Sequence, residues 1–433
     1  MIEPNWLDFY EEHLDIMNIY LIIILTALIG EFALRSIARY LNLKALDPKL
    51  PDEFEGFYDG DKYRQSQEYT RAGAKFAYIS STFDLCLILA FILAGGFNVV
   101  DNFVRGFNLS PVPTGLIFFA ILYFARDIIS IPFSLYGDFV IEERFGFNKM
   151  TVKTFVLDQL KTYALAIILG VPLLGGVLYF FEKTGSYAWI YAWGLISFFI
   201  IIAPPLFTTL IAPMFNKFTP LEEGELKEAI QGYTAKVKFP LTEISVMDGS
   251  KRSTHSNAYL SGFGAKKRIA LFDTLIDKHS VGELVSVIAH EVGHHKKKHV
   301  VKGTVLSVLH AGLLLFLLSR FVENRALFDA FQMEGVSIYA GVVFFSILYT
   351  PIELVLSIGL NYMSRKHEYE ADAFAAETIT SPEPLISGLK NLSVANLGNL
   401  TPHPLTVFLN YSHPPVLQRI TALRQFSSPS PPS

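Results

Sequence analysis

Long apolar segments alternate with polar segments along most of the chain. Crossing a bilayer as a helix takes about 20 mostly apolar residues, and about seven stretches meet that length. They are residues 18–34, 81–100, 113–135, 156–181, 187–211, 303–321 and 337–361. The pattern predicts about seven transmembrane helices, five of them within residues 1–211 and two within 303–361. Because seven is odd, we expect the two ends of the chain on opposite sides of the membrane.

Three polar blocks separate or follow these stretches. Residues 42–79 are rich in charge and tyrosine and carry turn signals such as "YDGDKY", which predicts a loop with partial helix. Residues 212–302 form a long polar segment before the sixth stretch. The third block, 362–426, continues the seventh stretch, and the closing "SSPSPPS" of 427–433 has the composition of a disordered tail.

The long polar segment mixes helical and extended patterns. "PLEEGELKEAIQGYTAKVK" has a helical period, whereas "LTEISVMD" and "KRIALFDTLI" have the composition of short strands. "SNAYLSGFGA" predicts an extended strand with a glycine-rich turn. In "SVGELVSVIAHEVGHHKKKH", Ser280 and Glu283 form a capping box, which marks the start of a helix. We therefore expect an α+β domain inserted into an all-α membrane bundle.

Composition and charge support a membrane protein and suggest its orientation. Of 433 residues, 51% are hydrophobic and 18% charged, which is too apolar for an ordinary soluble domain of this length. The leader "MIEPNWLDFYEEHLDIMN" is acidic, unlike the basic start of a signal peptide, so we expect the first stretch to remain as a true span. Lys and Arg are dense after the first, third and fifth stretches and sparse after the second and fourth. The positive-inside rule then predicts an external N-terminus, with residues 212–302 and the C-terminus in the cytoplasm.

Other compositional features narrow the function. The net charge of −4 gives no sign of nucleic-acid binding, and the single cysteine, Cys86, excludes a disulfide framework and a thiolate metal site. Ionisable residues within or beside the apolar stretches predict a bundle interior or a water-filled chamber, and pairwise ion pairs in a tight bundle are the alternative. These residues are Glu31, Asp84, Arg126, Asp127, Asp158, Lys161, His310 and Glu353.

The segment "HEVGH" at 290–294 carries the clearest chemistry. On a helix, His290 and His294 lie on one face, close enough for both imidazoles to reach one tetrahedral metal ion. Glu291 lies about 100 degrees around the helix, where it can accept a proton from water at the open coordination position. The alternative is an amphipathic helix whose polar face happens to contain these residues.

A third ligand is expected, because catalytic zinc usually has three protein ligands and a water. In "SRKHEYEADAFA" at 364–375, Glu368 and Asp372 are four residues apart. Glu368 can complete a His2Glu site, and Asp372 can accept a ring N–H from a ligating histidine. Glu370 is a rival ligand on a different helical face, and a solvated helix with spare charges is the alternative for the whole segment.

Further histidines near these motifs are interpreted as non-ligands. Helical periodicity turns His295 and His299 away from the face of the "HEVGH" histidines. With the intervening "KKK" they predict a basic collar that anchors to lipid headgroups before the sixth span. His255 and His367 are placed in the same non-ligand group.

With these motifs, the sequence resembles the type I CAAX prenyl endopeptidases, which are integral-membrane zinc proteases. Besides "HEVGH", the resemblance rests on "EERFGFNKMT" at 142–151, "APMFNKFTPLEEGELK" at 212–227, "HSNAYLSGFGAKKRIALFDTLI" at 255–276, "SRKHEYEADAFA", and "YSHPPVLQRI" at 411–420. The "HKKKH" that follows the zinc motif is more basic than the family pattern, and we expect this departure not to touch the site.

The resemblance implies a specific set of site residues. His290, His294 and Glu368 would hold one zinc ion, with Glu291 as general base and acid. "SNAY" looks like the edge strand that receives substrate in thermolysin-like enzymes, which implicates Asn257.

The same resemblance assigns residues that surround the reacting peptide bond. The backbone around Ala258 would pair with the peptide as an added strand. His413 and Arg419 match the family's "HPPxxxR" and are similar to residues that stabilise the oxyanion and bind substrate. Without the resemblance, "SHPP" is a turn and Arg419 a surface charge.

The expected fold is a membrane all-α bundle of about seven helices around a chamber, with an inserted α+β gluzincin-like protease domain. The two polar blocks 212–302 and 362–426 would build that domain. The expected function is zinc-dependent cleavage near a C-terminal lipidated cysteine of CaaX-type substrates at the cytoplasmic face, with peptide substrate and membrane lipids as partners. The alternatives are a general quality-control membrane metalloprotease and a non-catalytic transporter or lipid-binding protein with structural zinc.

Overall fold

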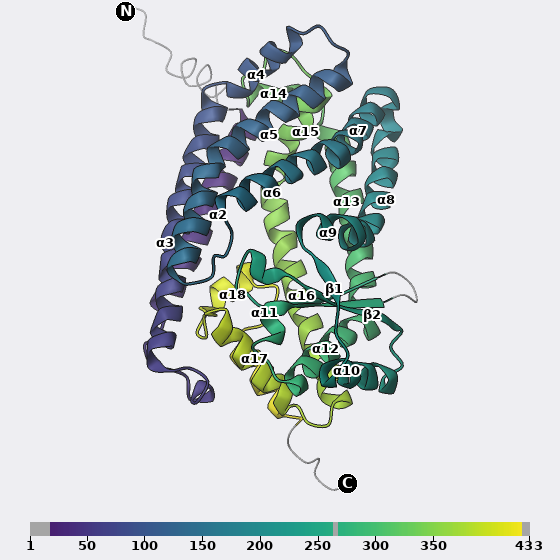
Figure 1. Cartoon of the computed structure of the whole chain (residues 1–433). Coiled ribbons are helices and arrows are strands. Elements are labelled where there is room, and N and C mark those ends of the chain that lie inside the picture. The colour runs from purple at the N-terminus through teal and green to yellow at the C-terminus, as the bar shows by residue number, and fades with distance from the viewer. Residues whose placement is uncertain (1–17, 263–266, 427–433) are drawn as a thin grey trace, which may run out of the picture.

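A computed structural model describes residues 18–262 and 267–426 of the chain. The acidic leader and the predicted tail at 427–433 fall outside these residues, and the glycine-rich turn after "SNAY" does so in part. Within them, an elongated helical bundle leads into a compact domain that holds a small sheet, and the first and last described residues lie at opposite ends of the molecule (Figure 1). This separation of the chain ends agrees with an odd number of membrane crossings.

The helices fall into a bundle group and a domain group. The bundle helices are α2 (Ile19–Lys44), α3 (Gly60–Leu93), α4 (Gly96–Arg105), α5 (Pro111–Tyr136), α6 (Val152–Leu165), α7 (Val171–Lys183), α8 (Ala188–Leu206), α9 (Ala212–Phe215), α13 (His299–Phe321), α14 (Arg325–Asp329), α15 (Ile338–Leu348) and α16 (Thr350–Thr378). The domain helices are α10 (Glu225–Lys236), α11 (Asp273–Ile276), α12 (Val281–Lys296), α17 (Glu383–Ala395), α18 (Pro404–Asn410) and α19 (Val416–Arg424).

The prediction of about seven spans is confirmed. In the described residues, six helices are long and apolar enough to cross a membrane: α2, α3, α5, α6 continued by α7 (Val152–Lys183), α8 and α13. The bent pair α15 and α16 gives a seventh if it is one span. The pair bends by 55° where α15 ends and α16 begins. Pro351 lies in the first turn of α16, where its missing N–H is tolerated but would interrupt a continuous helix.

Two predicted boundaries differ from the structure. The helix predicted for part of 42–79 is present but covers more of that segment than expected, because α2 continues to Lys44 and α3 already begins at Gly60, capped by Asp59. The dense charges of that segment suggested a loop, but they lie on the exposed side of the first turns of a 34-residue helix. The predicted second span also ends early, at Leu93, since Gly95 adopts a left-handed φ of 67° and starts α4 in a new direction.

Most residues of the membrane-spanning helices are not buried by protein. In the most apolar window of each of the six spans, 6% to 17% of the residues are buried, so most of these side chains can face lipid. A dense aromatic core, which includes Phe118, Phe331 and Phe344, joins the bundle helices near α4, α14 and α15. The packed aromatic core therefore lies at the end of the bundle remote from the sheet (Figure 1), and the predicted chamber within the bundle stays a prediction.

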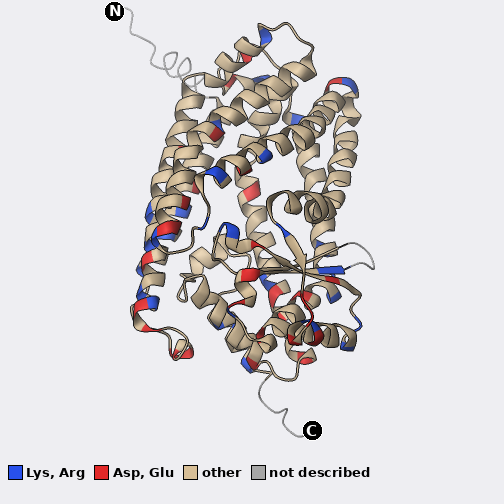
Figure 2. Ribbon diagram, viewed as in Figure 1, with Lys and Arg blue, Asp and Glu red and all other residues tan. Residues whose placement is uncertain are grey.

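Most ionisable residues of the spans have an ion-pair partner, but the pairs below are partly exposed and so do not identify a tight bundle. Asp84 approaches Arg126 at 3.3 Å, and His310 approaches Glu353 at 3.2 Å across α13 and α16. Asp158 binds the guanidinium of Arg252 at 2.7 Å and so connects α6 to the compact domain. Figure 2 shows most of the charged residues around that domain and along the adjoining part of α3, with fewer on the rest of the bundle.

The compact domain contains a four-stranded sheet of order β1-β2-β4-β3. The strands are β1 (Phe218–Pro220), β2 (Leu241–Met247), β3 (Ala258–Ser261) and β4 (Lys267–Phe272). β2 and β4 are parallel, and β1 and β3 add antiparallel at the two edges. The strands predicted in "LTEISVMD" and "SNAY" are confirmed, whereas the strand predicted for "KRIALFDTLI" stops at Phe272 and turns into α11. The short β1 was not predicted.

The sheet and α12 share one apolar core with the C-terminal helices. Ile244 and Leu271 from the sheet, Ile288 and Val292 from α12, and Leu385 from α17 are all buried in it. The α12 helix starts at the predicted capping box, in which Ser280 and Glu283 each accept a backbone hydrogen bond from the other. Glu283 is itself buried and also accepts hydrogen bonds from α17, so the start of α12 is fixed on two sides.

Candidate metal centre

The side chains of His290, His294 and Glu368 converge on one point between α12 and α16. Nε2 of His290 lies 3.1 Å from Nε2 of His294 and 3.4 Å from Oε2 of Glu368. Nε2 of His294 lies 3.3 Å from Oε1 of Glu368. The two predicted motifs, 74 residues apart in the chain from His294 to Glu368, are therefore brought together as a three-ligand cluster.

A close helix contact produces this convergence. α12 packs along α16, and Gly293 lies where their backbones meet. A Cβ added at Gly293 would lie 3.0 Å from both the Cα and the carbonyl oxygen of Ala371, which is tighter than ordinary packing. The glycine inside "HEVGH" therefore sets the distance between the histidines on one helix and the glutamate on the other.

The cluster fits a zinc ion in both size and donor type. A tetrahedral site with bonds of about 2.0–2.1 Å places neighbouring ligand atoms about 3.3 Å apart, close to the three separations found here. Oε2 of Glu368 is buried and accepts no hydrogen bond from the described part of the chain. A buried carboxylate oxygen without a donor is costly unless a cation or another partner compensates it. Two imidazoles and one carboxylate are a donor set that zinc accepts.

Asp372 and Arg419 contact the ligand residues on the buried side of the cluster. Nδ1 of His290 lies 2.8 Å from Oδ1 of Asp372, as expected for an aspartate that orients a ligating histidine. Arg419 donates from Nε and Nη2 to the two oxygens of Asp372, at 2.8 and 2.6 Å. Its Nη1 also lies 3.5 Å from Oε2 of Glu368. Both Asp372 and Arg419 are buried, so this network is shielded from solvent.

The local environment shifts the proton affinities of two "HEVGH" residues. Burial lowers the pKa of His290, but the hydrogen bond to Asp372 and the nearby carboxylate of Glu368 outweigh burial and raise that pKa to about 9. A metal ion bound at Nε2 would have to displace this proton. Burial raises the pKa of Glu291, and the adjacent imidazoles of His290 and His294 only partly oppose it. A carboxylate of raised proton affinity suits a group that accepts and returns a proton.

His413 and Arg419, the other two predicted catalytic residues, both approach Glu368 but differ in exposure. His413 stands beside the cluster, with Nε2 at 3.4 Å from Oε1 of Glu368 and a side chain that is 65% exposed. Arg419, by contrast, lies beneath the cluster, where it contacts Asp372 and Glu368. This position favours a role in holding those carboxylates over direct contact with substrate.

Asn257 and Ala258 begin the free edge of the sheet. Within the described residues β3 pairs with β4 alone, and β3 contacts α12, which carries the histidines. Asn257 is exposed, and its Oδ1 accepts a hydrogen bond from the N–H of Ala258. An unpaired edge beside a candidate metal site is a surface to which an extended peptide can add.

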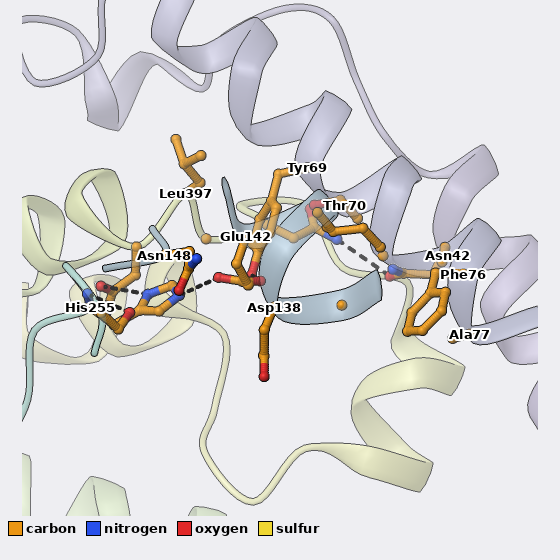
Figure 3. A pocket seen from close by; sticks show the side chains of 18 of the residues that line it. Asn42, Tyr69, Thr70, Phe76, Ala77, Asp138, Glu142, Asn148, His255 and Leu397 are labelled. Atoms are coloured by element: carbon orange, nitrogen blue, oxygen red, sulfur yellow. Dashed lines mark hydrogen bonds and ion pairs between the residues drawn. The ribbon is translucent and has the colours of Figure 1, made fainter. Parts of the chain in front are cut away.

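A cavity of about 890 Å³ adjoins this region, between α3, the end of α5 and the loops of the compact domain. Figure 3 shows Tyr69, Glu142 and His255 side by side on its wall. The Tyr69 hydroxyl donates to Glu142 at 2.7 Å, and Nε2 of His255 lies 3.2 Å from the other Glu142 oxygen. His255 precedes Asn257 by two residues and Tyr411 precedes His413 by two, so two wall segments continue from the cavity into the site.

One histidine that the sequence excluded does touch the cluster. His299 was expected to point away from the zinc motif, but its Nδ1 lies 3.1 Å from Nδ1 of His294. The expectation assumed one continuous helix, whereas Lys298 adopts a left-handed φ of 58° and separates α12 from α13. Periodicity gives no signal for such a break. His295 behaves as predicted and packs against Phe239 instead.

Comparisons with known sequences match nearly the whole chain. Residues 39–217 match a family described as CAAX prenyl protease N-terminal, five membrane helices, and residues 220–427 match Peptidase family M48. CAAX prenyl protease 1 from Saccharomyces cerevisiae is 35% identical over 91% of this chain and 93% of its own length. The human CAAX prenyl protease 1 homolog is 31% identical over 87% of this chain and 88% of its own length.

The fold agrees with that of a solved relative. The crystal structure of S. mikatae Ste24p matches with a TM-score of 0.87 and 35% sequence identity. The match covers 94% of this chain and 99% of the other. Bundle and compact domain are therefore shared as one architecture.

Proposed function

The chain belongs to the CAAX prenyl protease family of M48 metallopeptidases, and on that premise we propose that it is a zinc-dependent endopeptidase acting near the C-terminal lipidated cysteine of CaaX-type substrates. The observation that carries the proposal is the convergence of His290, His294 and Glu368, with Glu291 beside them, at the junction of a soluble helix and a membrane span. Family membership, which makes the chain a metalloendopeptidase, decides against the transporter hypothesis.

His290, His294 and Glu368 would hold the metal, which when bound would polarise the scissile carbonyl and lower the pKa of a water. Glu291 accepts the proton of the attacking water and returns it to the leaving amine. Glu291 lies next to the imidazoles of His290 and His294, and burial raises the proton affinity of its carboxylate. This environment supports its assignment as the group that accepts and returns the proton.

The residues around the cluster bind the peptide, stabilise the oxygen that gains charge, and position the metal ligands. Asn257 and the backbone of Ala258 pair with the peptide at the free edge of β3. His413, exposed beside Glu368, donates to the oxygen that gains charge during attack. Arg419 and Asp372 hold the ligands in place from the buried side.

The position of the site favours substrates that are attached to the membrane. α12 ends at Lys296, and the membrane helix α13 begins at His299, only five residues after His294. A peptide held near the bilayer by a lipid group would therefore reach the cluster without leaving the membrane surface. The density of Lys and Arg in 212–302 supports placing this site on the cytoplasmic side.

The test compares a fluorogenic peptide carrying a farnesylated C-terminal CaaX box with its non-lipidated twin. Purified wild type, Glu291→Gln and chelator-treated protein are assayed with both peptides. We expect cleavage of the lipidated peptide only, lost in both controls. Equal cleavage of the two peptides would favour the general membrane protease, and no cleavage by wild-type protein with zinc bound would refute the proposal.

A further inference from the structure

The two zinc-motif histidines have different partners on the ring nitrogen that faces away from the ligand cluster. Nδ1 of His290 meets the carboxylate of Asp372 directly. Nδ1 of His294 meets another imidazole, that of His299, at 3.1 Å. Nε2 of His299 then lies 3.0 Å from Oε2 of Glu370. His294, His299 and Glu370 thus form a continuous chain that leads away from the cluster.

A helix break creates this chain. Lys297 caps α12, Lys298 takes the left-handed conformation, and α13 starts in a new direction at His299. The break folds the backbone so that a residue five positions after His294 returns to contact it. On an uninterrupted helix, a residue five positions on is rotated about 140 degrees away. The left-handed turn therefore has a specific geometric result, which is the approach of His299 to His294.

Hydrogen-bond chemistry allows one consistent assignment of protons along the chain. Nε2 of His294 faces the ligand cluster, so the neutral ring carries its proton on Nδ1 and donates it to Nδ1 of His299. His299 then carries its own proton on Nε2 and donates it to Glu370. Each nitrogen has one role, and the chain ends on a carboxylate, as such orienting chains usually do.

The surroundings keep His299 in this position. Its side chain is 4% exposed, and the ring of His367 from α16 stacks on it with a centroid distance of 4.0 Å. Lys302, one turn further along α13, lies 3.9 Å from the Glu370 carboxylate. The imidazole is therefore fixed by a ring on one face and by hydrogen bonds at both nitrogens.

We propose that His299 and Glu370 are positioning residues that fix the tautomer and ring orientation of His294 as a metal ligand. The two residues do not contact substrate in this role. Asp372 acts on His290 through one contact, whereas Glu370 acts on His294 through an intervening ring. The inference also gives Glu370 a place in the site other than that of a rival zinc ligand. It rests on the proposed metal site, and its test separates the two.

The test measures zinc affinity of the full-length protein in detergent by competition with a chelator. His299→Phe keeps the buried ring and its stacking on His367 but removes both nitrogens. We expect its zinc affinity to fall about 10- to 100-fold, the usual effect of losing an orienting partner. His295→Phe is the matched control, because it makes the same replacement at a histidine that points away, and its affinity should stay at the wild-type value.

Two further variants test the order of the chain. His299→Gln can still accept at its oxygen and donate from its nitrogen, so it should recover most of the lost affinity. Glu370→Gln should weaken binding less than His299→Phe. The double variant His299→Phe/Glu370→Gln should be no weaker than His299→Phe alone, because the carboxylate acts through the ring.

A spectroscopic measurement distinguishes positioning from general damage. The visible absorption bands of Co²⁺, bound in place of zinc, report ligand geometry, and we expect them to change in His299→Phe but not in His295→Phe. Wild-type affinity and an unchanged spectrum in His299→Phe would overturn the inference, as would additive losses in the double variant. If His299→Phe does not fold, wild-type affinity in Glu370→Gln overturns it instead. Failure of the wild-type protein to bind metal would refute the proposed function.

Discussion

Gly293→Ala offers a sharp test of how the two ligand-bearing helices are spaced. The added methyl group would lie 3.0 Å from the Cα and the carbonyl oxygen of Ala371, and both are backbone atoms that cannot rotate away. Relief to an ordinary contact of about 3.6 Å requires α12 and α16 to separate by several tenths of an ångström at this point. A metal site tolerates ligand displacements of about 0.2 Å, so the histidines would be pulled from Glu368 beyond that tolerance.

The substitution has opposing effects on stability. Replacing glycine by alanine within a helix normally stabilises by about 0.5–1 kcal/mol, whereas overpacking of a tight contact costs about 1–3 kcal/mol. We therefore expect Gly293→Ala to lower the stability by up to about 2.5 kcal/mol. We also expect weaker zinc binding, because the strain falls between the ligands.

The matched control is Gly232→Ala, which adds the same methyl group in the interior of α10 with nothing within 4 Å. Thermal unfolding in detergent and chelator competition are measured for both variants and wild type. Gly232→Ala should be slightly more stable, with unchanged zinc affinity. If Gly293→Ala is stabilised to the same degree and binds zinc like wild type, the close contact does not set the ligand spacing and the reasoning is wrong.

Four further outcomes follow from the contacts. Glu291→Gln should reduce turnover by about 10²- to 10⁴-fold while the zinc content of the purified protein is unchanged. Asp372→Asn should weaken zinc binding about 10- to 100-fold in chelator competition, through the loss of a charged partner for His290. Metal binding displaces the proton of His290, whose pKa is about 9. The apparent zinc affinity should therefore fall by about tenfold for each pH unit from pH 8 to pH 6, and an affinity that does not change with pH would contradict this. Glu283→Gln should lower the stability by about 1–3 kcal/mol in thermal unfolding. The carboxylate of Glu283 accepts from Ser280 and Asn391, and the new amide N–H would face one of these donors instead of accepting from it.

The Glu283 prediction has its own pH dependence. Burial would raise the pKa of Glu283, but hydrogen bonds from Ser387 and Ser280 outweigh burial and hold that pKa below its usual range. The stabilisation is therefore complete above the unfolded pKa of about 4.3 and is lost as the pH falls below it toward the folded value. The difference between wild type and Glu283→Gln should shrink under acid conditions. A difference that grows on acidification would contradict the assignment.

Local pattern was sufficient for the parts of the site that lie on regular helices. His290, His294, Glu368 and Asp372 all follow from the helical i, i+4 spacing, and the capping box at Ser280 marks the start of α12. The structure adds the distances that bring these residues into one cluster.

Features that depend on departures from regular structure could not be predicted in the same way. His299 reaches His294 only because Lys298 is left-handed, and lysine carries no preference for that conformation. The buried position of Arg419 depends on where α19 packs against α16 and α17, which local sequence does not encode. Only partial helix was predicted at 42–79, because the first turns of α3 are polar, a composition shared by loops and solvated helices.

The bend between α15 and α16 makes α16 a lever whose far end carries the third ligand. From Thr350 to Glu368 the helix rises about 27 Å at 1.5 Å per residue, so a tilt of only 2 degrees at the bend would move Glu368 by about 1 Å. That displacement is several times what a metal site tolerates. The helix must therefore be clamped close to Glu368, and α18 supplies the clamp. Asn361 donates to the carbonyl of Leu409 at 3.1 Å, and Arg365 donates to the carbonyls of Val407 and Tyr411 at 3.1 and 2.6 Å. The same seven-residue helix contributes no ligand but also packs on the span α2, where Thr406 donates to the carbonyl of Ala38 at 2.9 Å, so the position of Glu368 depends on how α18 holds α16 beside α2.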